Sequence, residues 1–153
     1  MRPAYHLVYL LVVSLVAPGC VSNADKIPPR EWNVNAIELT ETPFFPQTQY
    51  QCGPASLATV LNTSGLNTDP ATLAGEVYIP GRKGSLQIEI IAVVRRHGRV
   101  PYEIDKGLQS IIDQLEHGLP VLVLLNLSIS ASPVYHYAVV IGYEPDSDSF
   151  IMR

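Results

Sequence analysis

The chain has 153 residues, with 10 Lys and Arg against 14 Asp and Glu, which gives a formal net charge of −4 at pH 7. This acidic balance, in a sequence without a basic patch, argues against a nucleic-acid partner. The length suits one domain with a hydrophobic core of its own.

Residues 1–19 are typical of a secretory signal peptide. Arg2 supplies a positive start, and residues 7–16 form an apolar run that is too short to span a bilayer. Small residues then lead up to Cys20, as in the lipobox of bacterial lipoproteins, although Ala17 stands where that motif usually has Leu. We therefore expect an exported protein of the bacterial cell envelope, anchored to a membrane by acyl chains on Cys20. Ordinary cleavage, with Cys20 as a bystander, is the alternative.

Residues 20–35 are polar and contain proline, so we expect a tether that leads into a domain of residues 36–153. The chain has only two cysteines, Cys20 and Cys52. If Cys20 is acylated, Cys52 stays a free thiol. A Cys20–Cys52 disulfide, which an oxidising compartment would permit, is the competing expectation.

Four segments with apolar residues at helical spacing predict helices, at residues 54–63, 70–77, 86–97 and 108–117. Asp69 and Ser85 are the expected N-caps of the second and the third helix. Between these two helices, Arg82 and Lys83 lie in a turn bounded by glycines. We interpret this turn as a solvated basic loop.

Extended segments are predicted mainly in the last part of the chain. Residues 35–39 look extended, and residues 100–104 read as a short strand. Residues 121–125 and 136–143 are apolar runs typical of buried strands, and residues 150–152 begin a further strand. The order of helices first and sheet last predicts an α+β fold with separate layers. The last predicted strand is cut at Arg153, so either the given sequence is a truncated product or a residue that a site on this sheet needs comes from elsewhere.

Cys52 lies where an irregular stretch passes into the first predicted helix. Pro54 has a preset φ that suits the first helical turn, which places Cys52 at the helix N-terminus. Unpaired backbone N–H groups and the positive end of the helix dipole favour the thiolate there. Because the thiolate is the nucleophilic form, this position predicts a reactive cysteine.

A nucleophilic cysteine needs a base beside it, most often a histidine. His6 lies in the predicted signal peptide, and His97 and His117 fall in the last turns of helices, where a role as dipole partners explains them. His136 instead opens an apolar strand directly after a loop. A hydrogen-bonded core histidine is the alternative, but the pair with Cys52 fits a Cys/His arrangement that folding brings together.

Two sequence blocks carry a family resemblance. Gln47 with residues 50–57 (YQCGPASL), and residues 135–143 (YHYAVVIGY), resemble the signature blocks of papain-like cysteine peptidases of the bacteriocin-processing, double-glycine type. The likeness covers residues 43 to 153 and is closest to stand-alone bacterial lipoprotein members. It implies a papain-like fold, in which an N-terminal helical part with the cysteine packs on a C-terminal antiparallel sheet with the histidine.

The resemblance also implies roles for single residues. Cys52 would be the nucleophile, and His136 its general base and acid. A glutamine ahead of the cysteine would help to hold the oxyanion through its side-chain amide. Gln47 is our choice for this role, and Gln49 and Gln51 remain competitors.

In the family, an Asp or Asn on the next strand orients the histidine. The matching positions in this chain are Ile151 and Met152, which cannot do so. Asp148 and Asp146 are the remaining candidates nearby. Both lie in a predicted turn, where a local backbone cap is the more common role of an aspartate.

The expected function is cysteine-dependent hydrolysis of a peptide or amide bond in a peptide or protein substrate. We expect no cofactor and no metal, because one free cysteine and scattered histidines give no zinc-like spacing. Two alternatives stay open. The same thioester chemistry could serve an acyltransferase, or the domain could be catalytically degenerate and bind a peptide or partner without turnover.

Overall fold

The computed structural model describes residues 34–47 and 49–153. The predicted signal peptide, Cys20 and nearly all of the predicted tether lie outside these residues. In the described part, no helix combines the length and the apolar character that crossing a membrane requires. The elements, in chain order, are β1 (Ile37–Glu38), α2 (Cys52–Thr63), α3 (Pro70–Val77), η2 (Pro80–Arg82), α4 (Gln87–Arg96), α5 (Leu108–Glu116), β2 (Val121–Asn126), β3 (Tyr135–Glu144), η3 (Pro145–Ser147) and β4 (Ser149–Met152).

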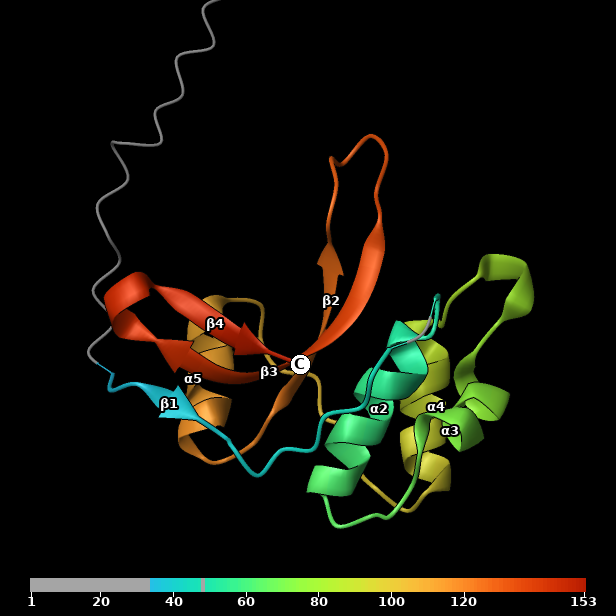
Figure 1. The fold of residues 1–153 in the computed structure, drawn as a ribbon, viewed down its shortest axis with the longest axis horizontal. Coiled ribbons are helices and arrows are strands. Elements are labelled where there is room, and N and C mark those ends of the chain that lie inside the picture. The colour runs from blue at the N-terminus through green and yellow to red at the C-terminus, as the bar shows by residue number, and fades with distance from the viewer. Residues whose placement is uncertain (1–33, 48) are drawn as a thin grey trace, which may run out of the picture. The chain divides into compact units, whose positions relative to one another are not determined.

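The fold is α+β, as the order of the predicted elements indicated. Helices α2, α3 and α4 form one group, and α5 packs against the sheet on its own (Figure 1). All sheet pairings are antiparallel and all involve β3, which pairs with β1, β2 and β4. Strand β3 is therefore the element on which the rest of the sheet is built.

Two apolar clusters make up the core, and β3 contributes to both. The first lies among α2, α3 and α4, around Leu57 and Leu73, and includes Tyr137 of β3. The second lies between α5 and the sheet and includes Val140 and Tyr143. Because each face of β3 is covered, its residues are buried without interruption from 137 to 143. This double burial explains why β3 is continuously apolar in sequence rather than alternating.

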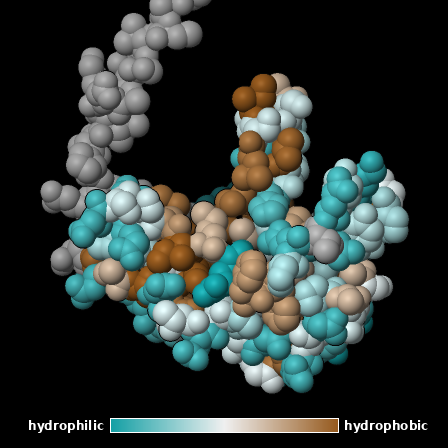
Figure 2. Space-filling model, in the orientation of Figure 1, coloured by the Kyte–Doolittle hydropathy of each residue, from teal (hydrophilic) through white to brown (hydrophobic). Residues whose placement is uncertain are grey.

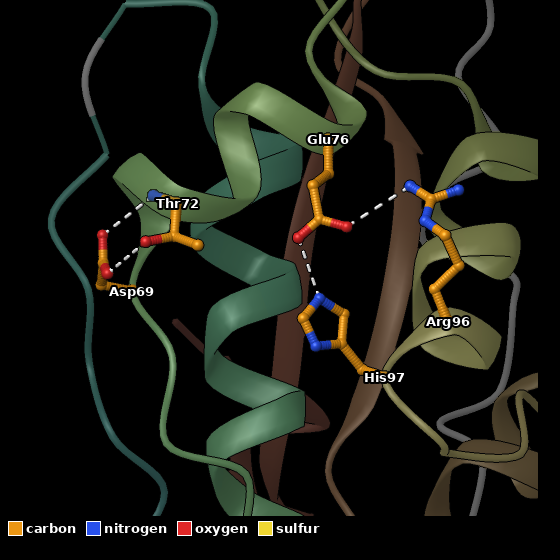
Figure 3. A network of polar contacts seen from close by, with 5 residues as sticks. All are labelled: Asp69, Thr72, Glu76, Arg96 and His97. Carbon is orange, nitrogen blue, oxygen red and sulfur yellow. Dashed lines mark hydrogen bonds and ion pairs between the residues drawn. The ribbon is translucent and has the colours of Figure 1, made fainter.

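Polar interactions fix the start of α3 and join its end to α4. Asp69 caps α3 as predicted, with its carboxylate accepting hydrogen bonds from the backbone N–H groups of residues 71 and 72 and from the Thr72 hydroxyl. These bonds lower the pKa of the Asp69 carboxyl, and the side-chain bond from Thr72 is the largest cause. Glu76 then ties α3 to the end of α4, 2.9 Å from the His97 ring and 3.4 Å from the Arg96 guanidinium (Figure 3).

Three predictions about secondary structure need correction. Ser85 does not cap α4, which begins at Gln87 without a side-chain cap. Residues 100–104 form no strand, and Val100 and Tyr102 are 90% and 81% exposed, because no neighbouring strand pairs with them. Strand β2 is only half-buried, with Leu124 45% exposed, because it has β3 on one side and no further strand beyond it.

Candidate active site

Cys52 is the first residue of α2. The two residues that follow it, Gly53 and Pro54, are buried, so the start of the helix is fixed by packing as well as by the proline. A helix leaves the N–H groups of its first turn without helical acceptors, and Pro54 has none to offer. The backbone N–H groups of Cys52 and Gly53 therefore remain as donors next to the sulfur.

A pocket of about 620 Å³ lies at this helix start. Four segments that are distant in sequence form its walls: the approach to α2, the loop between η2 and α4, β2, and the start of β3. Figure 2 shows the hollow between the projecting β2–β3 hairpin, which carries hydrophobic residues near its tip, and the more hydrophilic loop opposite. Its lining residues are Gln47, Tyr50, Cys52, Arg82, Lys83, Gly84, Ser85, Leu86, Gln87, Leu124, Tyr135, His136 and Tyr137.

The pocket brings together the predicted nucleophile and the predicted base. Cys52 and His136 are 84 positions apart in the chain (136 − 52 = 84), and both line it. His136 lies near the start of β3, opposite Leu125 of β2. Although both residues are described, no hydrogen bond joins the thiol to the imidazole. Such loose geometry is common in unliganded active sites, where the catalytic hydrogen bonds tighten only when substrate binds.

Tyr137 is a pocket residue that sequence reasoning missed. Consecutive side chains of a strand point to opposite faces, so His136 and Tyr137 lie on different faces of β3. The Tyr137 ring packs against the start of α2. Burial raises the pKa of the Tyr137 hydroxyl, and the negative charge of the nearby Cys52 thiolate raises it further. The hydroxyl therefore stays protonated next to the sulfur. The alternation of side chains along β3 predicts that Tyr137 lies at the pocket only when it is known which face of β3 packs against α2.

Gly53 and Ser85 pack closely together beside the pocket. A Cβ placed on Gly53 would overlap the Ser85 Oγ, would lie 2.6 Å from the Ser85 Cβ and would lie 3.6 Å from the Tyr137 ring. The Ser85 hydroxyl is buried in this contact and has no hydrogen-bond partner among the described residues. Ser85, predicted as a helix cap, instead holds the loop before α4 against the residue that follows the cysteine.

The structure separates the three candidate glutamines. Gln47 lines the pocket, whereas Gln49 and Gln51 do not. Gln51 serves as the N-cap residue of α2 and makes no side-chain capping bond. Of the three side chains, the Gln47 amide is therefore the one located where it could reach an oxyanion.

The two aspartates considered as orienting residues are not near the histidine, which corrects that assignment. Asp146 and Asp148 lie at the η3 turn beyond the far end of β3. Glu144 lies eight positions along the strand from His136, which corresponds to about 26 Å at about 3.3 Å per position. The Asp148 carboxylate instead accepts a hydrogen bond of 2.9 Å from the Tyr143 hydroxyl. The Asp148 carboxylate is thus engaged at the turn by a tyrosine and not by the histidine.

The pocket contains no metal-binding arrangement. Over residues 34–47 and 49–153, no three His, Cys, Asp or Glu side chains gather as metal ligands would. The chemistry available here is that of a thiol, an imidazole, amide donors and a phenol, a set suited to nucleophilic attack on a carbonyl.

A family model, described as the Peptidase_C39 like family, matches residues 34–153. The chain belongs to the Peptidase_C39-like family. Membership confirms the predicted relationship to C39-type papain-like peptidases and agrees with the α+β fold described above. A search of curated proteins gave no match. The finer predictions, a bacteriocin-processing type and a lipoprotein, remain predictions.

Proposed function

We propose that this member of the Peptidase_C39-like family hydrolyses peptide or amide bonds by a cysteine-dependent mechanism. The observation that carries the proposal is the shared pocket: Cys52 at a helix start and His136 on the central strand line the same cavity. Family membership supports the reaction class. A papain-like reaction needs the thiol and the imidazole within reach of each other in a site that is open to substrate, and a shared pocket meets the second condition.

The proposed reaction has two halves. In the first, the His136 ring takes the thiol proton, and the Cys52 sulfur attacks the substrate carbonyl carbon. The backbone N–H of Cys52 and the Gln47 amide hold the oxyanion, and such fixed donors are typically worth about 3–4 kcal/mol each in the transition state. The C–N bond then breaks, the amine leaves with the proton from His136, and a thioester remains. In the second half, His136 activates a water molecule that releases the acid and restores the thiol.

A cysteine-directed probe tests this proposal. We expect an alkylating reagent to label Cys52 near neutral pH faster than it labels a free thiol, because His136 acts as its general base. The labelling should vanish in Cys52→Ser and slow by about tenfold or more in His136→Ala, in line with the loss of a general base. Mass spectrometry of the intact protein measures the rate.

The matched control is His117→Ala, which removes a histidine at the end of α5, away from the pocket. This variant should keep the wild-type labelling rate. If wild-type Cys52 reacts no faster than a free thiol, the peptidase proposal fails. That result would favour the alternative of a domain that binds a peptide without turnover, for which the missing hydrogen bond between Cys52 and His136 is the supporting observation. If an added amine captures the acyl group, the same thioester serves an acyltransferase.

We further propose that the protein acts outside the cytoplasm, attached to a membrane of the bacterial cell envelope. The support is in the sequence alone: the short apolar run after Arg2 and the small residues before Cys20. An acidic chain gains little from anionic lipid headgroups, so acyl chains on Cys20 would supply the attachment. Its substrates would then be peptides or proteins of the same compartment.

A further inference from the structure

The charge of the pocket differs from that of the chain. The sequence carries more acidic than basic residues, yet the pocket lining includes Arg82 and Lys83 and no Asp or Glu. Both cations come from the turn between α3 and α4 that sequence reasoning took for a solvated loop. They lie across the pocket from the β2–β3 hairpin, on the loop at the right of Figure 1.

The backbone of this turn holds the two cations in place. Ile79 and Gly84 form an isolated antiparallel bridge, with a hydrogen bond of 2.8 Å from the Ile79 N–H to the Gly84 carbonyl. Between them, η2 ends at Arg82, and its C-cap residue Lys83 donates its N–H to the Pro80 carbonyl at 3.1 Å. These backbone hydrogen bonds fix the conformation of the turn and so the directions of the Cα–Cβ bonds of Arg82 and Lys83. Both residues line the pocket as a result.

Lys83 also contacts the segment that leads into Cys52, through Tyr50. Its ammonium lies 5.5 Å from the centre of the Tyr50 ring, within the range of a cation–π contact. Lys83 and Tyr50 have φ values of 50° and 65°, a left-handed conformation that only one other non-glycine residue of the described ranges adopts. Strained backbone of this kind persists where surrounding structure imposes it, and it is concentrated at functional sites.

Neither cation is neutralised by a carboxylate in the part of the chain that the structure describes. Among residues 34–47 and 49–153, no carboxylate forms an ion pair with Arg82 or Lys83; the pairs present involve Arg96 and His97. The positive end of the α2 dipole points into the same pocket, since Cys52 begins that helix. The pocket therefore combines three sources of positive potential, and its described lining contains no carboxylate.

We propose that Arg82 and Lys83 form a carboxylate-recognition site that makes acidic peptides the preferred substrates. The inference rests on the proposed peptidase function and names the substrate class of that site. An arginine fork binds a carboxylate in a bidentate manner, and a lysine adds a point charge beside it. The opposite wall, with Leu124 and Tyr135, is largely apolar and suits an uncharged part of the same peptide.

The recognised carboxylate could belong to an acidic side chain or to a free C-terminus, and two pairs of cysteine-directed probes distinguish these sources. In the first pair, peptide vinyl sulfones differ only in a Glu or a Gln. In the second pair, epoxysuccinyl peptides differ only in a free or an amidated C-terminus. The second-order rate of Cys52 modification is measured for each. We expect the acidic member of one pair to react about tenfold faster, a difference that should shrink as salt rises from about 0.05 to 0.5 M and screens the charges.

The double variant Arg82→Gln/Lys83→Gln should lose this preference. The matched control is Arg95→Gln/Lys106→Gln, which removes the same charge outside the pocket and should keep it. Equal rates for both members of both pairs in the wild type would overturn the inference, even if every probe reacts quickly and the peptidase function stands.

A binding measurement separates this inference from the chemistry. In Cys52→Ser, fluorescence anisotropy compares a labelled Glu peptide with its Gln counterpart, and a labelled free acid with its amide. Tighter binding of an acidic member, lost in the Arg82→Gln/Lys83→Gln background, supports carboxylate recognition even if no probe labels Cys52. Equal binding within both pairs contradicts it.

Discussion

At the scale of single residues, the position after the nucleophile shows why the cysteine block has its composition. Gly53 has no side chain because Ser85 occupies the space where a Cβ would lie. The loop that carries Arg82 and Lys83 can therefore approach the start of α2 closely. The same contact leaves the Ser85 hydroxyl buried without a partner in the described part of the chain. Buried hydroxyls usually have a partner, so this close approach has an energetic cost.

Gly53→Ala should lower the free energy of unfolding by about 1–3 kcal/mol, the usual cost of overpacking, and should slow the labelling of Cys52. Adding Ser85→Gly should restore much of the lost stability and of the labelling rate, because it removes the Oγ and the Cβ that the new methyl group meets. Ser85→Ala should restore less, since the Cβ remains. Urea denaturation and the labelling rate measure the two effects. A Gly53→Ala protein as stable as the wild type would show that this contact is not tight.

At the scale of elements, β3 links the two halves of the core and also the core to the pocket. Its start lines the pocket, Tyr137 near that start packs in the cluster with α2, and Val140 and Tyr143 further along pack against α5. A register shift between Val140 and Gly142 lets Val140 and Tyr143 reach the same cluster, although three positions separate them. Two tyrosines of this strand, Tyr137 and Tyr143, are 4% and 1% exposed.

The buried tyrosines of β3 predict a loss of stability at alkaline pH. Burial raises the pKa of both hydroxyls, and for Tyr143 the hydrogen bond to Asp148 raises it further. Because the folded protein holds these protons more tightly than the unfolded chain, their contribution is complete below the ordinary tyrosine pKa of about 10. It is lost as pH rises through the higher folded-state values.

Melting temperatures between about pH 8 and pH 11 test this expectation. Tyr137→Phe and Tyr143→Phe should each flatten the decline at high pH, because each removes one titrating group. Tyr102→Phe, at a side chain that is 81% exposed, is the control and should leave the decline as in the wild type. Identical pH profiles in all three variants would contradict the prediction.

At the scale of the whole molecule, the described domain and the N-terminal sequence suggest different tasks. Residues 34–153 match the family model and contain the pocket. Residues 1–20 have the pattern of a signal peptide and an acylated cysteine. Lipid attachment on Cys20 would keep the Cys52 thiol out of an intrachain disulfide, since the chain has no third cysteine.

Expression of the full chain in a bacterial host with a radiolabelled fatty acid tests the attachment. Label should enter the wild-type protein and be absent from Cys20→Ser, whereas Cys52→Ser should be labelled like the wild type. Two acyl chains bind a membrane firmly, so the wild-type protein should fractionate with membranes. A wild-type protein that is released without label would refute the lipoprotein prediction.

The sequence by itself determined the helices, the strand that carries His136 and the two signature blocks, because these depend on local periodicity, capping and turn residues. The helix cap at Asp69 was predictable for this reason, and so was the placement of Cys52 at a helix start. Family membership followed from the same blocks.

Only the tertiary structure decided which residues meet at the pocket. Nothing local to Arg82, Lys83 or Ser85 indicates that their loop returns to the start of α2, and nothing local to Tyr137 indicates which face of β3 meets that helix. The exclusion of Asp146 and Asp148 likewise depended on the length and direction of β3. Contacts between segments far apart in the chain depend on how complete elements pack, and no local pattern records that packing.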